Sequence, residues 1–427
     1  MTTSRRLLCT LVAAATLTLL TPTGTQSATA RATTAQAAHR HGWTGTWQAA
    51  PSHAVPPLPG ATIRNVVHTS VGGSLARIRL TNRFGATPLQ LGAVTVALQL
   101  PGRPADPAAV PGSMRRATYQ GASAFTVPAG RDLLTDPVPL AVPADANLLV
   151  TLYTPVGSAG PATLHRSAFQ TNFLAPGGDR TADESGTGFT STTRSWYYLT
   201  GVDVRGSRAR GSVVTLGDSI TDGTGSTLDA NRRWPDRLAA RLRELPPHRQ
   251  LGVLNAGIAG NRLFLEGTGP AGLVRFDADV LSRSGVRAVI VLEGVNDLKG
   301  VPEQIDPAAF ETAYRGLVQR AHARGIRVIG GTIAPFAGHG GHTPAREAAR
   351  QSVNHLIRTG GIFDGVADFD AAVRDPERPE RILPAYDPGD HLHFNDAGLQ
   401  ALADAVDLDD LSAPTRDDRV TRAAAQH

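Results

Sequence analysis

The hydrophobic pattern of this chain changes at about residue 210, and this change constrains the fold more than any other feature. Before it, residues 75–80 alternate apolar and polar side chains, and 94–100 and 147–153 are two further short β-like runs between breaks rich in Gly and Pro. A period of two with turn residues between the runs is typical of strands that bury one face. Residues 42–204 are therefore expected to form an all-β domain of the sandwich or jelly-roll-like type.

After residue 210, nearly continuous apolar runs at 213–216, 251–254, 288–292 and 327–333 alternate with amphipathic segments. Two helical stripes lie between these runs: Trp234, Leu238, Leu242 and Leu245, and Phe310, Tyr314, Leu317 and Ala321. Continuous apolar strands separated by helices indicate a parallel sheet that is covered on both faces. Residues 210–410 are therefore expected to form a three-layer α/β/α domain, with ligands beyond the carboxyl ends of its strands.

The first 30 residues have the pattern of a secretory signal peptide. Arg5 and Arg6 precede an apolar stretch at 7–20, and Ala28-Thr29-Ala30 follows as a small-x-small cleavage site. The apolar stretch is well short of the roughly 20 residues that a membrane span needs, so no stable span is expected. The protein is expected to be secreted and extracellular, by either Sec or twin-arginine export.

The charge of the chain does not indicate a nucleic-acid partner, although 42 basic residues exceed 37 acidic ones. The basic residues are spread among acidic ones, without long runs or interleaved aromatic residues.

Two segments outside the predicted domains have low sequence complexity or high polarity. Residues 31–41 are interpreted as a spacer and residues 411–427 as a disordered tail.

A serine stands directly after the first strand of the predicted parallel sheet. Gly217-Asp218-Ser219 begins the segment 217–223, a tight Gly-initiated turn at the carboxyl edge of that sheet. This is where a nucleophile would lie, although Asp218 or Ser219 could equally cap the following helix. The Gly-x-Ser-x-Gly elbow of α/β-hydrolases is absent at this turn, which disfavours the machinery of that fold.

Candidate oxyanion donors follow the next two strands. Gly260 lies in the Gly-rich turn 255–261, and Asn296 lies in the segment 293–297. A turn of this kind can offer a backbone N–H, and an asparagine its side-chain amide, to a tetrahedral oxyanion. Taken singly, each residue could instead be a simple turn or cap residue.

A candidate base and its partner occur near the C-terminus, where Asp390 precedes His393 by three residues. Over that spacing the carboxylate can reach one ring nitrogen and leave the other free for a serine proton. His391 competes for the same role because it adjoins Asp390. Since the side chains of adjacent residues diverge, His393 is preferred.

These motifs together resemble the SGNH/GDSL hydrolase family over residues 210–410. Its four blocks appear in order as Gly217-Asp218-Ser219, the Gly260 turn, Gly294-x-Asn296-Asp297 and Asp390-x-x-His393. The resemblance implies a flavodoxin-like fold without a metal or organic cofactor. It also implies roles for the residues of the blocks: Ser219 as nucleophile, the N–H groups of Ser219 and Gly260 and the side chain of Asn296 as oxyanion donors, and Asp218 and Asp297 in support.

Two further points qualify this resemblance. Phe394 follows His393 where the family often has proline, a change that is expected to affect the lining of the pocket more than activity. The N-terminal region is also similar to that of larger secreted members, through Trp43-Thr44-Gly45-Thr46-Trp47 and Ala49-Ala50-Pro51.

The sequence therefore predicts a serine esterase in which Ser219 forms an acyl-enzyme and His393 acts as base and then as acid. An imidazole base is protonated in acid, so activity is expected to fall below about pH 6. Acyl groups on polysaccharides or small esters are the leading substrate class, and lipids or phospholipids are second. A carbohydrate-binding protein with a vestigial hydrolase domain is the alternative, which the intact motifs disfavour.

Three other interpretations of the sequence are less favoured. His339 and His342 could be metal ligands, but a solvent-exposed loop is preferred because no cysteine or spaced acidic partner accompanies them. Trp196-Tyr197-Tyr198 could stack on sugars, but strand aromatics more often belong to a core. Flavin binding is disfavoured because no Ser/Thr-rich phosphate loop follows the first strand of the parallel sheet.

Overall fold

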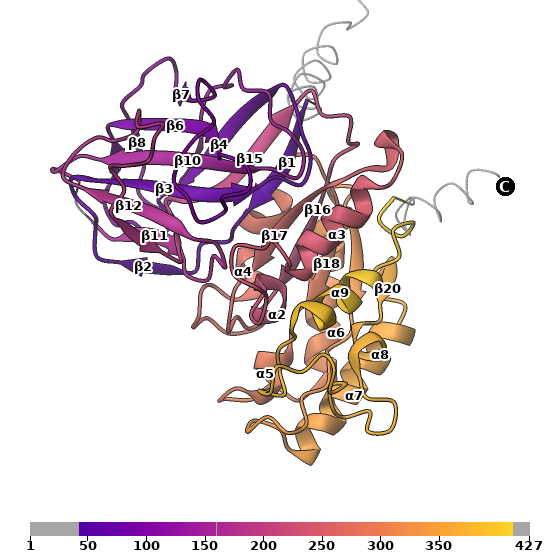
Figure 1. Ribbon diagram of the computed structural model, residues 1–427. Coiled ribbons are helices and arrows are strands. Elements are labelled where there is room, and N and C mark those ends of the chain that lie inside the picture. The colour runs from indigo at the N-terminus through magenta and orange to yellow at the C-terminus, as the bar shows by residue number, and fades with distance from the viewer. Residues whose placement is uncertain (1–41, 159, 413–427) are drawn as a thin grey trace, which may run out of the picture. The chain divides into compact units, whose positions relative to one another are not determined.

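The computed structural model describes residues 42–158 and 160–412. The predicted signal peptide and spacer, and most of the predicted tail, lie outside the described residues. Within the described part, the chain is rich in strands up to Arg205 and alternates strands with helices from Ser212 onward (Figure 1). The change of hydrophobic pattern at about residue 210 therefore marks a change of architecture.

The strand-rich region consists of antiparallel sheets. The four-stranded sheet has the order β1 (Trp43–Gln48), β15 (Leu199–Arg205), β4 (Leu75–Thr81), β9 (Asp132–Leu134). The six-stranded sheet has the order β13 (Ser191–Thr193), β12 (Asn172–Pro176), β3 (Ala61–His68), β10 (Asn147–Thr154), β6 (Ala93–Leu98), β7 (Arg115–Ala117). The smaller sheets are β14 (Trp196–Tyr197), β11 (Ala162–His165), β2 (His53–Val55), and β5 (Leu89–Leu91), β8 (Phe125–Val127).

One hydrophobic core joins the two larger antiparallel sheets. Ile63 and Val150 reach it from the six-stranded sheet, and Ile78 and Val202 from the four-stranded sheet. Trp196, only 1% exposed, lies in the same core, as the strand reading of that aromatic segment predicts. The region is rich in strands as expected, and its assignment to the sandwich or jelly-roll class stays a prediction.

The second part of the chain is built on a parallel sheet. Its strands run in the order β17 (Gly252–Gly257), β16 (Ser212–Gly217), β18 (Val286–Leu292), β19 (Arg327–Gly331), β20 (Gly365–Ala367). Numbered along the chain this order is 2-1-3-4-5, the order of flavodoxin-like sheets. The four strands expected from apolar runs are present, and β20 is a further strand that the sequence analysis did not find.

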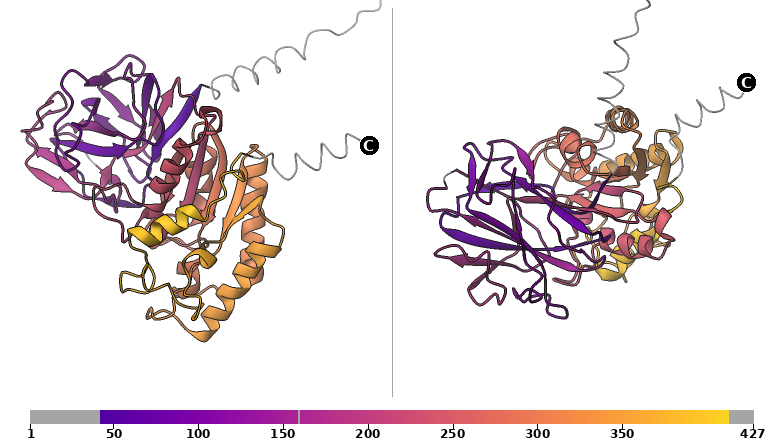
Figure 2. Two further views of the ribbon diagram at one scale, coloured as in Figure 1. Left: turned by 45° about the vertical axis from the view of Figure 1, so that its right-hand side comes forward. Right: turned by 90° about the horizontal axis from the view of Figure 1, so that it is seen from above.

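Helices cover both faces of this sheet (Figure 2). Along β18, Val289 and Val291 enter the hydrophobic cluster that contains α6 and α7, whereas Ala288 and Ile290 enter the cluster that contains α3 and α9. Alternating side chains on a buried strand therefore meet two helical layers, as the three-layer prediction requires. The helices of the described part are α2 (Ser219–Asp222), α3 (Trp234–Arg243), η1 (Pro247–Arg249), α4 (Gly272–Phe276), η2 (Asp277–Leu281), α5 (Val295–Lys299), α6 (Pro307–His322), α7 (Pro344–Thr359), α8 (Phe369–Val373), α9 (Asp396–Asp404).

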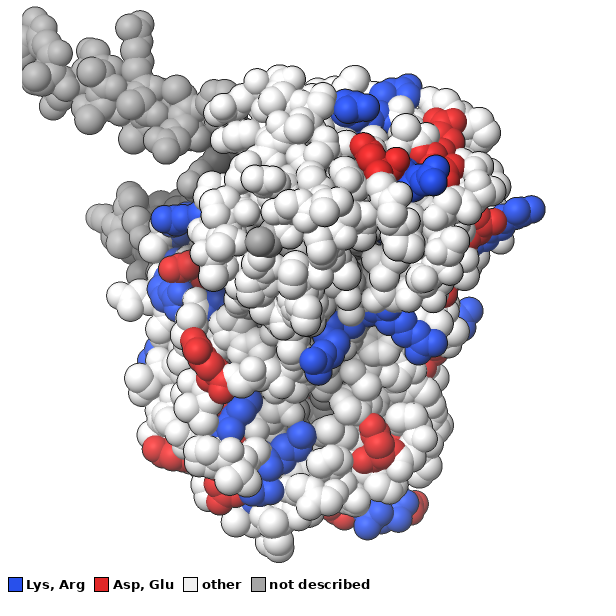
Figure 3. All heavy atoms as spheres, turned by 90° about the vertical axis from the view of Figure 1, so that its left-hand side faces the viewer, with Lys and Arg blue, Asp and Glu red and all other residues white. Residues whose placement is uncertain are grey.

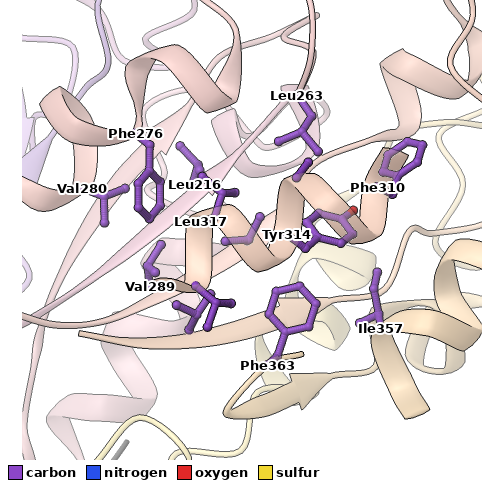
Figure 4. Close-up of a cluster of buried hydrophobic side chains, with 14 of the residues drawn as sticks. Leu216, Leu263, Phe276, Val280, Val289, Phe310, Tyr314, Leu317, Ile357 and Phe363 are labelled. Atoms are coloured by element: carbon purple, nitrogen blue, oxygen red, sulfur yellow. The ribbon is translucent and has the colours of Figure 1, made fainter. Parts of the chain in front are cut away.

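The core on the α6 side is dense in aromatic side chains (Figure 4). Phe310 and Tyr314 of α6 contact each other with ring centroids 5.9 Å apart, and Tyr314 also contacts Phe363 at 5.3 Å. The buried Tyr314 hydroxyl donates to the Glu293 carbonyl at 3.1 Å, so its polar atom is satisfied. Because Glu293 directly follows β18, this contact fixes α6 against the carboxyl edge of the sheet.

One predicted helical position is wrong. The apolar stripe predicts that the first helix includes Leu245, but α3 ends at Arg243. Pro246 and Pro247 follow closely, and neither can donate the backbone N–H that a continuing helix needs. Leu245 still packs against the α3 and α9 cluster as a partly buried side chain.

Figure 3 shows acidic and basic side chains interspersed on one face of the molecule. None of the helices in the described residues is long and apolar enough to cross a membrane.

Candidate functional site

The turn after β16 presents Ser219 at the carboxyl edge of the parallel sheet. Asp218 accepts a hydrogen bond from the Ile220 N–H at 2.9 Å and so caps α2, which begins at Ser219. A Cβ at Gly217 would lie 2.1 Å from the Thr221 hydroxyl oxygen, so this tight turn requires glycine. The capping role weighed for Asp218 is therefore real, and it places the serine rather than competing with it.

A chain of hydrogen bonds connects Ser219 to His393 and Asp390. The Nε2 atom of His393 lies 2.8 Å from the Ser219 hydroxyl, and its Nδ1 atom lies 2.6 Å from the Asp390 carboxylate. Because an ionised carboxylate only accepts, Nδ1 carries a proton and Nε2 is free to accept the serine proton. The arrangement can generate a nucleophilic oxygen at Ser219.

The Asp390 carboxylate is also held by backbone donors. Its second oxygen accepts the N–H groups of Leu392 at 3.0 Å and His393 at 2.9 Å. Burial raises the pKa of Asp390, but these N–H groups and the His393 ring together hold it below its ordinary value. Asp390 therefore stays ionised in mild acid.

His391, the competing histidine, pairs with a different carboxylate. Its Nδ1 atom lies 2.5 Å from Asp387, and its backbone has a φ of +61°, in the left-handed region. This turn directs the ring to Asp387, so the structure brings His393 and not His391 to Ser219. Asp387 is not among the residues that the sequence motifs single out.

Phe394 does not line a pocket, contrary to expectation. Its side chain is completely buried in the hydrophobic cluster formed by α3 and α9. The absence of proline at this position therefore alters packing beneath the turn rather than the wall of the site.

The two candidate oxyanion donors lie after strands that flank β16. Gly260 follows β17 with a φ of +79°, and Asn296 lies in the first turn of α5, after β18. The Asn296 amide donates one hydrogen to the carbonyl of Asn261 at 2.9 Å. Its second amide hydrogen remains available to a ligand, and the bond to Asn261 couples α5 to the Gly260 turn.

Asp297 strengthens that coupling. Its buried carboxylate accepts the backbone N–H of Leu263 at 2.7 Å and that of Phe264 at 3.2 Å. Burial raises the pKa of Asp297, while these N–H groups oppose the change. Asp297 thus holds the segment after Gly260 against α5.

A buried arginine that the sequence analysis missed ties three strand ends together. Arg275 donates to the carbonyl oxygens of Gly217 at 2.9 Å and Ala256 at 2.5 Å, and pairs with Glu293 at 3.1 Å. Its charge opposes an accumulation of buried acids, since burial raises the pKa of Asp218 to about 7 and raises that of Glu293 well above its ordinary value. In the sequence, Arg275 could be recognised only as an arginine that stands between apolar residues of α4.

A second buried ion pair lies beside Ser219. Asp222, the last residue of α2, is 2.9 Å from the Nε2 atom of His165, at the end of β11. Its other oxygen accepts the Ala259 N–H at 2.8 Å, one residue before Gly260. Asp222 lies within the segment 217–223 that follows the first strand of the parallel sheet, whereas no sequence motif points to His165.

No group of three or more His, Cys, Asp or Glu side chains in the described residues could hold a metal ion. His339 is half-buried and accepts the Gly341 N–H at 3.0 Å through Nδ1. His342 lies 3.8 Å from the Glu347 carboxylate. That distance is too long for a hydrogen bond, so of the two histidines only the His339 side chain is held within its own segment.

Part of the chain is similar to known proteins. Residues 215–401 match the GDSL-like lipase/acylhydrolase family, which confirms the family that the four motifs indicate. Similar solved structures include an acetyl xylan esterase from Geobacillus stearothermophilus, which is 22% identical over 48% of this chain and 95% of that chain, with a TM-score of 0.37. A carbohydrate acetylesterase from Sinorhizobium meliloti is 18% identical over 47% of this chain and 98% of that chain, with a TM-score of 0.36. An aryl esterase from M. smegmatis is 16% identical over 45% of this chain and 95% of that chain, with a TM-score of 0.36. No match was found among curated proteins.

Proposed function

We propose that this chain, whose residues 215–401 form a domain of the GDSL-like lipase/acylhydrolase family, is a serine esterase that cleaves carboxylic esters through an acyl-enzyme. The observation that carries the proposal is the pair of hydrogen bonds at His393, 2.8 Å to the Ser219 hydroxyl and 2.6 Å to the Asp390 carboxylate. Together they provide a nucleophile, a base and a group that orients the base.

In the proposed reaction, Nε2 of His393 takes the proton of Ser219 as the serine oxygen attacks the ester carbonyl carbon. The carbonyl oxygen becomes negative and receives hydrogen bonds from the N–H groups of Ser219 and Gly260 and from the amide of Asn296. The imidazolium, stabilised by Asp390, then protonates the departing alcohol oxygen as its bond to the acyl carbon breaks. Water repeats the sequence on the acyl-enzyme and releases the acid.

The direct test is Ser219→Ala assayed with p-nitrophenyl acetate. Loss of the nucleophile should lower kcat by at least about 10³-fold and abolish covalent labelling by a fluorophosphonate. Ser352→Ala is the matched control, because Ser352 lies on α7 and its hydroxyl donates only within that helix. An unchanged rate in Ser219→Ala would refute the proposal.

The substrate class proposed is an acyl group carried by a polysaccharide or a small ester, and the site of action proposed is extracellular. Support comes from the signal-peptide pattern of residues 1–30 and from a strand-rich region that accompanies the α/β part. Acetyl, butyryl and long-chain p-nitrophenyl esters, acetylated xylan and a phospholipid should be compared by kcat/KM. Preference for the phospholipid would overturn this choice in favour of lipids. Protein recovered from the medium with residues 1–30 still attached would overturn the proposal that these residues are a cleaved signal peptide.

A further inference from the structure

His165 is buried between two hydrogen-bond acceptors. The side chain lies at the end of β11, in the strand-rich region, and the residue is only 2% exposed. Its Nδ1 atom is 2.7 Å from the Ala50 carbonyl oxygen, and its Nε2 atom is 2.9 Å from the Asp222 carboxylate. A carbonyl and an ionised carboxylate can only accept, so both ring nitrogens carry protons and His165 is an imidazolium.

The electrostatic surroundings agree with a charged ring. Burial lowers the pKa of His165, but the Asp222 charge and the hydrogen bonds to Asp222 and Ala50 outweigh it and raise the pKa above its ordinary value. Arg233, which precedes α3, acts in the opposite direction. Burial, Arg166 and the His165 charge together lower the pKa of His53 on the neighbouring strand β2.

Asp222 transmits this contact to the turn that bears Gly260. One carboxylate oxygen binds His165, and the other accepts the Ala259 N–H at 2.8 Å. Both partners are needed to fix the carboxylate plane, since a single bond would leave it free to rotate about the Cβ–Cγ axis. The backbone of α2 is pressed against the same segment, because a Cβ at Gly257 would lie 2.2 Å from the Asp222 nitrogen.

We propose that His165 is a positioning residue of the esterase site, which acts through Asp222 and Ala259 to hold the Gly260 N–H where the oxyanion forms. The strand-rich region thereby takes part in catalysis through one buried side chain, without touching the ester. This inference rests on the proposed function, because an oxyanion turn has a purpose only if Ser219 attacks a carbonyl.

Two isosteric variants separate positioning from simple stabilisation. In His165→Gln, the amide nitrogen can occupy the place of Nε2 and still donate to Asp222. In His165→Asn, the shorter amide can reach only the place of Nδ1, so the bond to Asp222 is lost. Removing one oxyanion donor costs about 10²–10³-fold in kcat, and displacing one should cost less. We expect kcat to fall about 10–100-fold in His165→Asn and only a few-fold in His165→Gln.

The decisive readouts are kcat, KM and the inhibition constant of an alkylboronic acid, which forms a tetrahedral adduct with the serine. A displaced donor should weaken boronate binding in parallel with kcat and leave KM within about 3-fold. His68→Asn is the matched control, because His68 also pairs with an aspartate in the strand-rich region, Asp145, at 3.1 Å. That control should retain the boronate affinity.

The outcomes are distinguishable from failure of the proposed function. If Ser219→Ala is inactive but folded His165→Asn has normal kcat and boronate binding, the positioning role is wrong and the esterase proposal stands. Equal losses of kcat and boronate affinity in His165→Asn and His68→Asn would also overturn the positioning role, because they would indicate a general effect on stability. Should His165→Asn not fold, Asp222→Ala decides, because it removes the oxygen that accepts the Ala259 N–H. Normal boronate binding in that variant would exclude the path to Ala259.

Discussion

At the scale of single residues, two aspartate–histidine pairs lie within residues 387–393, and only one of them contacts the serine. Asp390→Asn should lower kcat by about 10²–10⁴-fold, because an amide can donate to His393 and favour the wrong tautomer. Asp387→Asn, the matched control, should change kcat by less than about 5-fold, since its partner His391 does not reach Ser219. Steady-state kinetics on p-nitrophenyl acetate provides the comparison. A larger loss of kcat in Asp387→Asn than in Asp390→Asn would contradict the assignment of the orienting role to Asp390.

Asp218 should make stability depend on pH. Burial raises its pKa to about 7 from an ordinary value of 3.8. The carboxyl therefore binds a proton in the folded state that the unfolded chain has released, and its contribution to stability is lost as the pH rises from about 4 through about 7. Asp218→Asn keeps an oxygen to cap α2 but cannot ionise, so it should be more stable than wild type at pH 8. We expect its advantage in the free energy of unfolding over wild type to be roughly 1–4 kcal/mol larger at pH 8 than at pH 5. Urea denaturation at both pH values measures this difference, and an equal effect at both would contradict the assignment.

Residues of the site differ in how far the sequence could identify them. Ser219, Gly260, Asn296 and Asp390 stand directly after apolar strands or beside a motif partner, so local pattern is sufficient to select them as candidates. The choice between the two histidines was harder, because it depends on the positive φ of His391. Arg275 and His165 could not be identified, since each is buried with partners far away in the sequence and leaves no periodic signal.

At the scale of elements, the close approach of β17 to α2 depends on Gly257. A Cβ there would lie 2.2 Å from the Asp222 nitrogen and 2.6 Å from the Thr221 carbonyl carbon, which are backbone atoms that cannot move aside. Gly257→Ala should therefore destabilise the fold by about 1–3 kcal/mol and lower kcat by more than about 10-fold, since the displaced turn carries Ser219. Thermal unfolding and esterase kinetics test both effects.

Gly316 is the control for this substitution. It lies inside α6, and a Cβ there meets no atom within 4 Å. Gly316→Ala should stabilise the protein by about 0.5–1 kcal/mol through helix propensity and leave kcat unchanged. If Gly257→Ala and Gly316→Ala changed stability and kcat in the same way, the close backbone contact at Gly257 would not explain the effects of Gly257→Ala.

The pattern of elements was more predictable than their limits. Buried strands of five or more residues, such as β16 and β18, stand out as apolar runs because both faces are covered. β20, with only three residues, gives no such run. The end of α3 was missed because the apolar stripe continues to Leu245, past the point where two prolines stop the hydrogen bonding.

At the scale of the whole molecule, a buried carboxylate joins the strand-rich and α/β parts. Asp279 in η2 pairs with Arg83 of the strand-rich region at 2.8 Å, and with Arg275 and Arg283 at 3.3 Å. Asp279→Ala should lower the free energy of unfolding by about 3–5 kcal/mol, because it leaves buried cations without their counter-charge. Asp277→Ala, on an exposed side chain of the same helix, should change it by less than about 1 kcal/mol. Equal urea midpoints for the two variants would show that Asp279 does not link the parts.

The pair formed by His165 and Asp222 also limits how such a protein can be recombined. A chimaera that joins the α/β part to an unrelated N-terminal half would leave Asp222 buried beside the nucleophile turn without a counter-ion. Positions 165 and 222 are therefore expected to be inherited jointly, and an engineer who exchanges the N-terminal half must supply a donor for that carboxylate.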